Sequence, residues 1–153
     1  MSHDDLSAER VIALLGLERH PEGGAFRETF KDPHTDPQGR ARATAIYFLL
    51  RAGERSHWHR VDASEVWHHY AGAPLTLAIS VDGHTVERVT LGDDLEAGQH
   101  PQAAVPAGAW QCAATEGAWT LAGCTVAPGF TFDGFALAPA DWEPGSGPPE
   151  TGD

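Results

Sequence analysis

Histidine, glutamate and aromatic residues gather in one short stretch of the sequence, SHWHRVDASEVWHHYAG, which runs from Ser56 to Gly72. Imidazoles and a carboxylate can hold a divalent metal ion, perform acid–base chemistry without a metal, or simply line a ligand pocket. One residue separates His57 from His59, so a regular strand would point both side chains to the same face. Glu65 follows after a gap that allows a turn and a return on the next strand. The stretch predicts a pocket at which these three side chains meet.

The residues after Glu65 alternate between two faces of the predicted strand. Trp67 and His69 share the face of Glu65, whereas His68 points to the opposite face. Alternation does not decide which face looks into the protein, so His68 and His69 both remain candidates. A histidine base with a tuned pKa suits proton transfer near neutral pH, with a carboxyl group or a tyrosine returning the proton. The predicted catalytic residues are His59, Glu65 and His69.

Two further segments carry residue types suited to ligand binding. In HPEGGAFRE the pair Gly23-Gly24 permits close backbone approach, and charged residues surround this turn. Arg27 is predicted either to bind an anionic group of a ligand or to form a structural ion pair. The segment GQHPQAAVPAGAWQ ends with a Pro-x-Gly turn and then Gln111, which we expect to line the pocket. The predicted ligand-binding residues are Glu22, Arg27, Tyr47, Trp67, His68 and Gln111.

Short strands must position these side chains. A helix is predicted near the start of the chain, capped by Ser7 and ended by Gly16. The hairpin signal is clearest at Asp82-Gly83. A Pro- and Gly-rich tail, residues 143–153, is predicted to be disordered after a single domain over residues 1–142. Strands are predicted at Ala25–Phe30, Thr44–Leu50, Ser56–Arg60, Glu65–Tyr70, Leu75–Val81, Val86–Leu91, Ala103–Val105, Trp110–Ala114, Trp119–Val126 and Phe130–Leu137.

Composition restricts the class of partner. Acidic residues outnumber basic ones 22 to 10 among 153 residues, which gives a formal net charge of −12. Such a field repels phosphate backbones, so nucleic acid is an unexpected partner. The first residues read as neither a signal peptide nor a membrane span. The only two cysteines, Cys112 and Cys124, form no Cys-x-x-Cys pair. We therefore expect a cytoplasmic protein with reduced thiols and no membrane contact.

The two polar segments together resemble the paired motifs of the cupin superfamily, namely His-x-His, then Glu and Gly, followed by Pro-x-Gly and a histidine. The resemblance implies metal ligands at His57, His59, Glu65 and Gln111 for a divalent ion such as Zn, Ni, Fe or Mn. Two departures are visible. The gap before Glu65 is one residue longer than in the usual motif. Gln111 stands at the position of the last histidine, and a neutral amide is the weaker ligand.

Five segments resemble more specifically the cupin family called domain of unknown function 985: HPEGGAFRETF, TAIYFLL, HRVDASEVWHHYAG, VPAGAWQCA and GCTVAPGFTFDGF. The resemblance implies an all-β, double-stranded β-helix (jelly-roll) barrel with a short N-terminal helix, shared with nucleotide-sugar epimerases and usually dimeric. It departs from the family at Ser64, where the usual residue is Asp. The family does not fix a reaction, because function depends on the site and not on the fold.

Three functions remain open from the sequence. The first is an epimerase- or isomerase-like acid–base enzyme that acts on a small sugar-like or anionic metabolite. The second is a metal-dependent cupin enzyme, such as an oxygenase, decarboxylase or isomerase. The third is a barrel that binds a small molecule without turnover. Convergence of acid, base and cation candidates favours catalysis.

Overall fold

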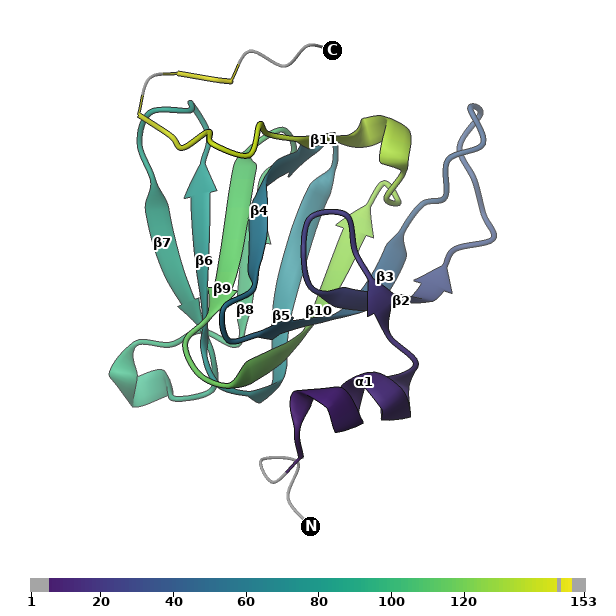
Figure 1. Ribbon diagram of the computed structural model, residues 1–153. Coiled ribbons are helices and arrows are strands. Elements are labelled where there is room, and N and C mark those ends of the chain that lie inside the picture. The colour runs from purple at the N-terminus through teal and green to yellow at the C-terminus, as the bar shows by residue number, and fades with distance from the viewer. Residues whose placement is uncertain (1–5, 146, 150–153) are drawn as a thin grey trace.

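The computed structural model describes residues 6–145 and 147–149, which form two antiparallel sheets packed face to face (Figure 1). In spatial order, the six-stranded sheet contains β1 (Glu18–Arg19), β2 (Ala25–Lys31), β3 (Thr44–Arg51), β10 (Trp119–Ala127), β5 (Ser64–Gly72) and β8 (Gln102–Val105). The five-stranded sheet contains β11 (Phe135–Leu137), β4 (Arg55–Val61), β9 (Trp110–Thr115), β6 (Leu75–Ser80) and β7 (Glu87–Leu91). Strands distant in sequence therefore lie side by side, as a jelly roll requires.

The structure confirms the predicted all-β barrel and most of the predicted strands to within one or two residues. The strand predicted over Phe130–Leu137 is the exception. Only its end, β11, is a strand, and a short 3₁₀ helix, η3 (Phe132–Gly134), precedes it. The Thr131 hydroxyl accepts a hydrogen bond from the Gly134 amide over 3.1 Å, which closes the turn locally. Such side-chain bonds offer the backbone an alternative to a ladder.

The predicted N-terminal helix is also confirmed. Helix α1 (Ala8–Leu15) begins after Ser7, whose hydroxyl accepts from the Arg10 amide, and it ends at Gly16 in the left-handed conformation. Its apolar side packs on the outer face of the six-stranded sheet, where Val11 of the helix clusters with Leu49, Ala71 and Trp119. The helix thus covers one end of a face that would otherwise meet water. A second 3₁₀ turn, η2 (Leu95–Ala97), connects β7 to β8.

The inward faces of both sheets form the main core. Phe48 and Trp67 come from the six-stranded sheet, and Leu75 and Leu77 from the opposite sheet; all four are almost fully buried. Alternation along β3 explains this arrangement, because Thr44, Ile46 and Phe48 point inward while Tyr47 and Leu49 point outward. Side chains fill the interior of one part of the barrel, and the other part contains a cavity.

The hairpin predicted at Asp82-Gly83 joins β6 to β7, and Gly83 adopts a φ of 79° that disfavours other residues. The C-terminal segment crosses near this hairpin, since the Gly145 amide donates to the Gly83 carbonyl over 2.9 Å. Glu143 accepts hydrogen bonds from Trp58 and Arg55 on the outside of β4. Disorder of the tail stays a prediction; residues 146 and 150–153 of that tail lie outside the described residues.

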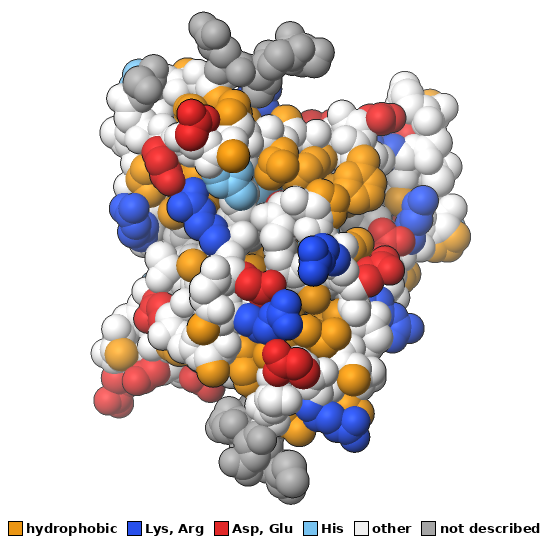
Figure 2. Space-filling model, viewed as in Figure 1, with side chains coloured by type: hydrophobic (Ala, Val, Ile, Leu, Met, Phe, Trp, Pro, Cys, Tyr) orange, Lys and Arg blue, Asp and Glu red, His pale blue; other side chains and the backbone are white. Residues whose placement is uncertain are grey.

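Within residues 6–145 and 147–149, no helix is long and apolar enough to cross a membrane. Acidic and basic side chains are interspersed on the face shown in Figure 2, and hydrophobic side chains gather in the upper part of that view. Figure 1 places β11 and η3 in this upper region, where Phe132 and Leu137 are among the exposed large hydrophobic residues.

Candidate functional site

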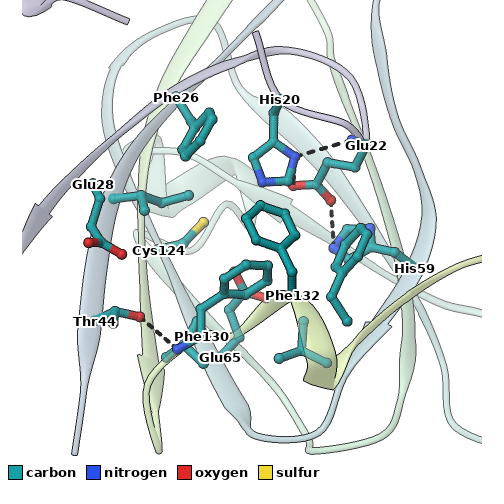
Figure 3. A pocket seen from close by; sticks show the side chains of 14 residues that line it. His20, Glu22, Phe26, Glu28, Thr44, His59, Glu65, Cys124, Phe130 and Phe132 are labelled. Atoms are coloured by element: carbon teal, nitrogen blue, oxygen red, sulfur yellow. Dashed lines mark hydrogen bonds and ion pairs between the residues drawn. The ribbon is translucent and has the colours of Figure 1, made fainter. Parts of the chain in front are cut away.

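A cavity lies between the two sheets beside η3 (Figure 3). Its free space is about 70 Å³, which admits roughly five water-sized groups. It is therefore large enough for a small metabolite and too small for a nucleotide sugar in this conformation. The cavity is lined by His20, Glu22, Phe26, Glu28, Thr44, Ile46, His59, Val61, Glu65, Cys124, Val126, Phe130, Phe132 and Phe135.

The turn between β1 and β2 carries Glu22 into the barrel. Gly23 and Gly24 have φ values of 107° and 86°, which favour glycine. A Cβ atom on Gly23 would lie 2.3 Å from the carbonyl oxygen of Arg55, so only glycine permits this approach to β4. The Glu22 carbonyl then accepts the His57 amide over 2.8 Å. This turn delivers the Glu22 carboxylate to a site where it is 8% exposed.

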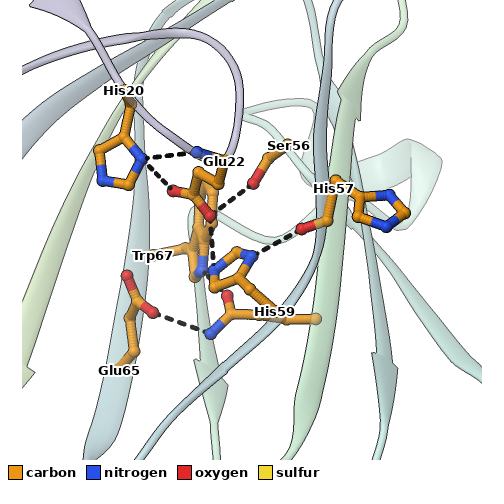
Figure 4. Close-up of polar contacts among 8 residues, drawn as sticks. His20, Glu22, Ser56, His57, His59, Glu65 and Trp67 are labelled. Carbon is orange, nitrogen blue, oxygen red and sulfur yellow. Dashed lines mark hydrogen bonds and ion pairs between the residues drawn. The ribbon is translucent and has the colours of Figure 1, made fainter. Parts of the chain in front are cut away.

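Glu22 and His59 form a buried ion pair at one side of the cavity (Figure 4). The His59 Nε2 atom lies 2.6 Å from Glu22 Oε2, and Ser56 donates its hydroxyl to the same oxygen over 2.8 Å. Burial alone would lower the pKa of His59, but the charge and hydrogen bond of Glu22 outweigh it and raise the pKa to about 9. Burial acts to raise the Glu22 pKa, yet His59 holds it below its ordinary value. Both groups are therefore charged at neutral pH.

A β-bulge in β4 decides which histidine enters the barrel. Ser56 pairs with Ala113 and His59 with Gln111, so β4 advances three residues while β9 advances two. Ser56 and His59 consequently both point inward. His57 instead turns outward, where its Nε2 atom lies 2.9 Å from the Pro139 carbonyl oxygen (Figure 4). The expectation that His57 and His59 share a face is wrong, because strict alternation fails at the bulge.

Glu65 stands at a second polar centre, held by Gln111. The Gln111 amide donates to Glu65 Oε1 over 2.8 Å, and Trp67 Nε1 donates to Gln111 Oε1 over 2.8 Å. An indole nitrogen can only donate, so it fixes the amide with its oxygen toward Trp67 and its nitrogen toward Glu65. Burial raises the pKa of Glu65 against the opposing charge of His59. The cavity thus holds a carboxyl group that retains its proton more readily than an ordinary glutamate.

His20 is a cavity residue that the sequence analysis did not single out. Its Nδ1 atom accepts the backbone amide of Glu22 over 3.1 Å, which requires a lone pair there and puts the ring proton on Nε2. Burial also lowers the pKa of His20, so the ring is neutral. In Figure 3 the nitrogen without a drawn hydrogen bond points into the cavity. The signal available in sequence was its place two residues before Glu22, beside the glycine pair.

The remaining predicted ligand-binding and catalytic residues lie away from the cavity. Arg27 donates to the Leu15 carbonyl over 3.1 Å at the end of α1. Tyr47 packs with the outer cluster beneath that helix. His68 stacks on Tyr70 and lies 3.3 Å from the Thr125 hydroxyl, and His69 lies 3.2 Å from the Ala73 carbonyl oxygen. The sequence left open whether His68 or His69 faces the pocket. Neither of them lines the cavity.

The segment around η3 supplies the cavity's aromatic side with Phe130, Phe132 and Phe135. Figure 3 shows Phe130 and Phe132 there. The predicted site residues that the structure does bring together are Glu22, His59, Glu65, Trp67 and Gln111, the last two behind the lining.

The donor set does not fit the divalent metal predicted from the cupin motifs. His57 faces outward, and both nitrogens of His59 are occupied, Nδ1 by the His57 carbonyl over 2.8 Å and Nε2 by Glu22. Gln111 presents its amide nitrogen, which cannot ligate a cation. Over the described part of the chain, no group of three or more His, Cys, Asp or Glu is arranged to hold a metal ion.

Two sheets rolled around an internal cavity define this molecule as a cupin barrel. The chain belongs to the cupin superfamily family DUF985, whose model matches residues 9–138. A crystal structure of a protein from Shewanella oneidensis is 40% identical, with a TM-score of 0.82 over 86% of this chain and 84% of that chain. A hypothetical protein from Leishmania major is 31% identical, with a TM-score of 0.78 over 85% of this chain and 86% of that one.

More distant solved structures agree on the fold alone. An oxalate decarboxylase variant of Bacillus subtilis is 12% identical, with a TM-score of 0.59 over 78% of this chain and 29% of that chain. No curated protein shows a significant match to this sequence. The cupin assignment is thus confirmed, and the reaction has to be argued from the cavity.

Proposed function

We propose that this cupin is an acid–base enzyme of the isomerase or epimerase kind, which moves a proton next to a carbonyl group of a small molecule. The observation that carries the proposal is the buried Glu65 carboxyl, with its raised pKa, in the same cavity as a neutral histidine and an imidazolium–carboxylate pair. Titratable groups pushed toward different protonation states in one cavity are typical of acid–base sites.

Glu65 is the group that exchanges the proton. In its ionised form, the carboxylate accepts a proton from the carbon next to the carbonyl. The C–H bond breaks, its electron pair forms a C=C bond, and the π pair of the C=O bond moves onto the oxygen to give an enolate. The protonated Glu65 then returns a proton to that carbon as the C=O bond re-forms. Return to the same face exchanges the hydrogen, and return to the other face, after the enolate turns over in the cavity, epimerises the carbon. Because burial raises the pKa of Glu65, its ionised form is a stronger base than an exposed carboxylate.

His20 is suited to polarise the carbonyl. Its neutral ring carries a proton on Nε2, directed into the cavity, and can donate a hydrogen bond to the substrate oxygen as negative charge develops there. His59 is not the free base predicted from sequence, because both its nitrogens are engaged. Its positive charge instead favours ionised Glu65, and Glu22 holds that charge in place.

Hydrogen exchange in simple carbonyl compounds tests this proposal while the natural substrate is unidentified. Acetone, dihydroxyacetone and pyruvate are incubated in D₂O with the protein, and loss of the proton signal next to the carbonyl is followed by NMR. We expect acceleration with at least one probe and its loss, by on the order of 100-fold, in Glu65→Gln. Glu87→Gln, which changes an exposed carboxylate on β7, is the matched control and should retain the rate.

Binding of a probe without exchange in the wild type would instead favour a non-catalytic ligand-binding barrel. A metal-dependent enzyme makes a different prediction, namely stoichiometric metal in the purified protein that His59→Ala loses. We expect no such metal because the donor set is unsuited.

The homodimer and the cytoplasmic location stay predictions, and light scattering on the purified protein tests the dimer.

A further inference from the structure

The cavity wall is more apolar than a sugar site requires. Seven of its lining residues are hydrocarbon side chains, four of them phenylalanines, and they come from β2, β3, β4, β10 and the segment around η3. These side chains offer a ligand contact area and no hydrogen bonds. The hydrocarbon side chains of the wall are Phe26, Ile46, Val61, Val126, Phe130, Phe132 and Phe135.

Most polar groups of the cavity already form hydrogen bonds or ion pairs within the protein. Both nitrogens of His59 are bonded, and Glu22 Oε2 accepts from Ser56 and His59. The Thr44 hydroxyl accepts the Phe130 amide over 2.9 Å. His20 Nε2 and the Glu65 carboxyl are the groups best placed to meet a ligand (Figure 3). A polyol buried here would leave hydroxyl groups without partners, which is costly.

The charge of the cavity also argues against an anion. No arginine or lysine is among its described lining residues, and Arg27 points to α1 instead. The one cationic side chain, His59, is neutralised by Glu22 at 2.6 Å. Glu28 adds a carboxylate to the lining, and the whole chain carries a net charge of −12. A buried carboxylate ligand would therefore have no free countercharge.

We propose that the substrate is a small, uncharged carbonyl compound with a hydrocarbon body, in place of a sugar or a carboxylate. The carbonyl part of this inference rests on the proposed acid–base function. The apolar body packs on the phenylalanine and valine wall, the carbonyl oxygen faces His20, and the carbon next to the carbonyl faces Glu65. The cavity's ~70 Å³ of free space limits the body to a short or singly cyclic hydrocarbon.

Three probes of similar size distinguish the classes: cyclopentanone, cyclopentanecarboxylate and erythritol. Binding is measured by isothermal titration calorimetry at neutral pH. We expect cyclopentanone to bind at least tenfold more tightly than the other two. Val126→Thr, which adds a hydroxyl to the cavity wall, should weaken cyclopentanone by on the order of tenfold. Val66→Thr on the neighbouring strand, outside the cavity, is the matched control and should bind as the wild type does.

The outcomes separate this inference from the proposed function. Tighter binding of erythritol or of the carboxylate, or no binding of cyclopentanone by a folded wild type, would overturn the substrate class. Cyclopentanone binding with no accelerated exchange of its hydrogens in D₂O would leave the ligand class standing and overturn the acid–base function. The thermal unfolding midpoint of each variant, compared with that of the wild type, distinguishes a loss of binding from a loss of fold.

Discussion

Gln111 donates a hydrogen bond to Glu65 over 2.8 Å and cannot turn its amide round, because Trp67 donates to the other end of that amide. A tryptophan of the core thereby sets which atom meets the acidic group of the cavity. The position where cupin motifs place a ligand for a metal ion serves here to hold a carboxyl group.

The first prediction concerns this amide. Gln111→Leu is close in volume but leaves the Trp67 N–H without a partner and removes the amide donor from the Glu65 carboxyl. We expect a loss of about 1–3 kcal/mol in the free energy of unfolding, with a shift in the tryptophan emission of the folded state. Urea denaturation followed by fluorescence measures both. Unchanged stability and emission would show that the hydrogen-bonded chain is not formed.

The second prediction compares the two histidines of the His-x-His sequence. His59→Ala leaves the buried Glu22 carboxylate unpaired and should cost about 3–5 kcal/mol. His57→Ala removes one hydrogen bond near the surface, to Pro139, and should cost no more than about 1 kcal/mol. Denaturant unfolding of both variants is the measurement. Equal losses would mean that the bulge in β4 does not separate the two side chains.

The third prediction follows from the raised pKa of His59. Because its pKa is about 9 in the folded protein and near 6.5 when unfolded, its contribution to stability is complete below pH 6.5 and is lost as the pH rises through 9. Glu65, whose pKa is also raised, adds a loss in the same direction that begins near the ordinary carboxyl pKa. Glu22, whose pKa is lowered, loses its contribution as the pH falls below about 4.5. The midpoint of thermal unfolding should therefore be highest near neutral pH or somewhat below it.

His59→Gln provides the comparison, since an amide can still donate to Glu22 but does not titrate. Between pH 6.5 and 9 the thermal unfolding midpoint of this variant should fall much less than that of the wild type. A variant curve parallel to that of the wild type would rule out an imidazolium at this position.

The fourth prediction concerns the size of the cavity mouth. Phe132 lines the cavity while 59% exposed, so Phe132→Ala removes part of the aromatic side at little cost to the core. We expect a change in unfolding free energy of less than about 1 kcal/mol. Larger cyclic ketones, such as cyclooctanone, should bind more tightly to the variant than to the wild type. Isothermal titration calorimetry on both proteins measures the binding. If both proteins prefer ketones of the same size, Phe132 does not limit the opening of the cavity.

Much of the fold could be predicted from sequence because local signals agree with it. Ser7 and Gly16 mark the helix, and alternating apolar residues with intervening turns mark the strands. The two-residue strand β1 and the turn η3 were missed, since a pair of residues has no period and the Thr131 side-chain bond overrides the strand pattern.

The candidate site could be predicted only in part. Glu65 was found because a carboxylate between apolar strand positions is costly to bury without a partner. His59 was found through the His-x-His motif, and Glu22 through its place beside the Gly23-Gly24 turn. The bulge that turns His57 outward depends on pairing between β4 and β9, and no local pattern specifies it. His20 gave no periodic signal, because it enters the barrel on a turn set by Gly23 and Gly24.

The protonation of Glu65 is the most direct test of the account. In protein with ¹³C-labelled glutamate, the Glu65 carboxyl signal is assigned by its absence in Glu65→Gln and followed from pH 3 to pH 9. The account predicts a titration midpoint clearly above that of the exposed glutamates, because burial raises the Glu65 pKa. A midpoint at or below that of the exposed glutamates would contradict it.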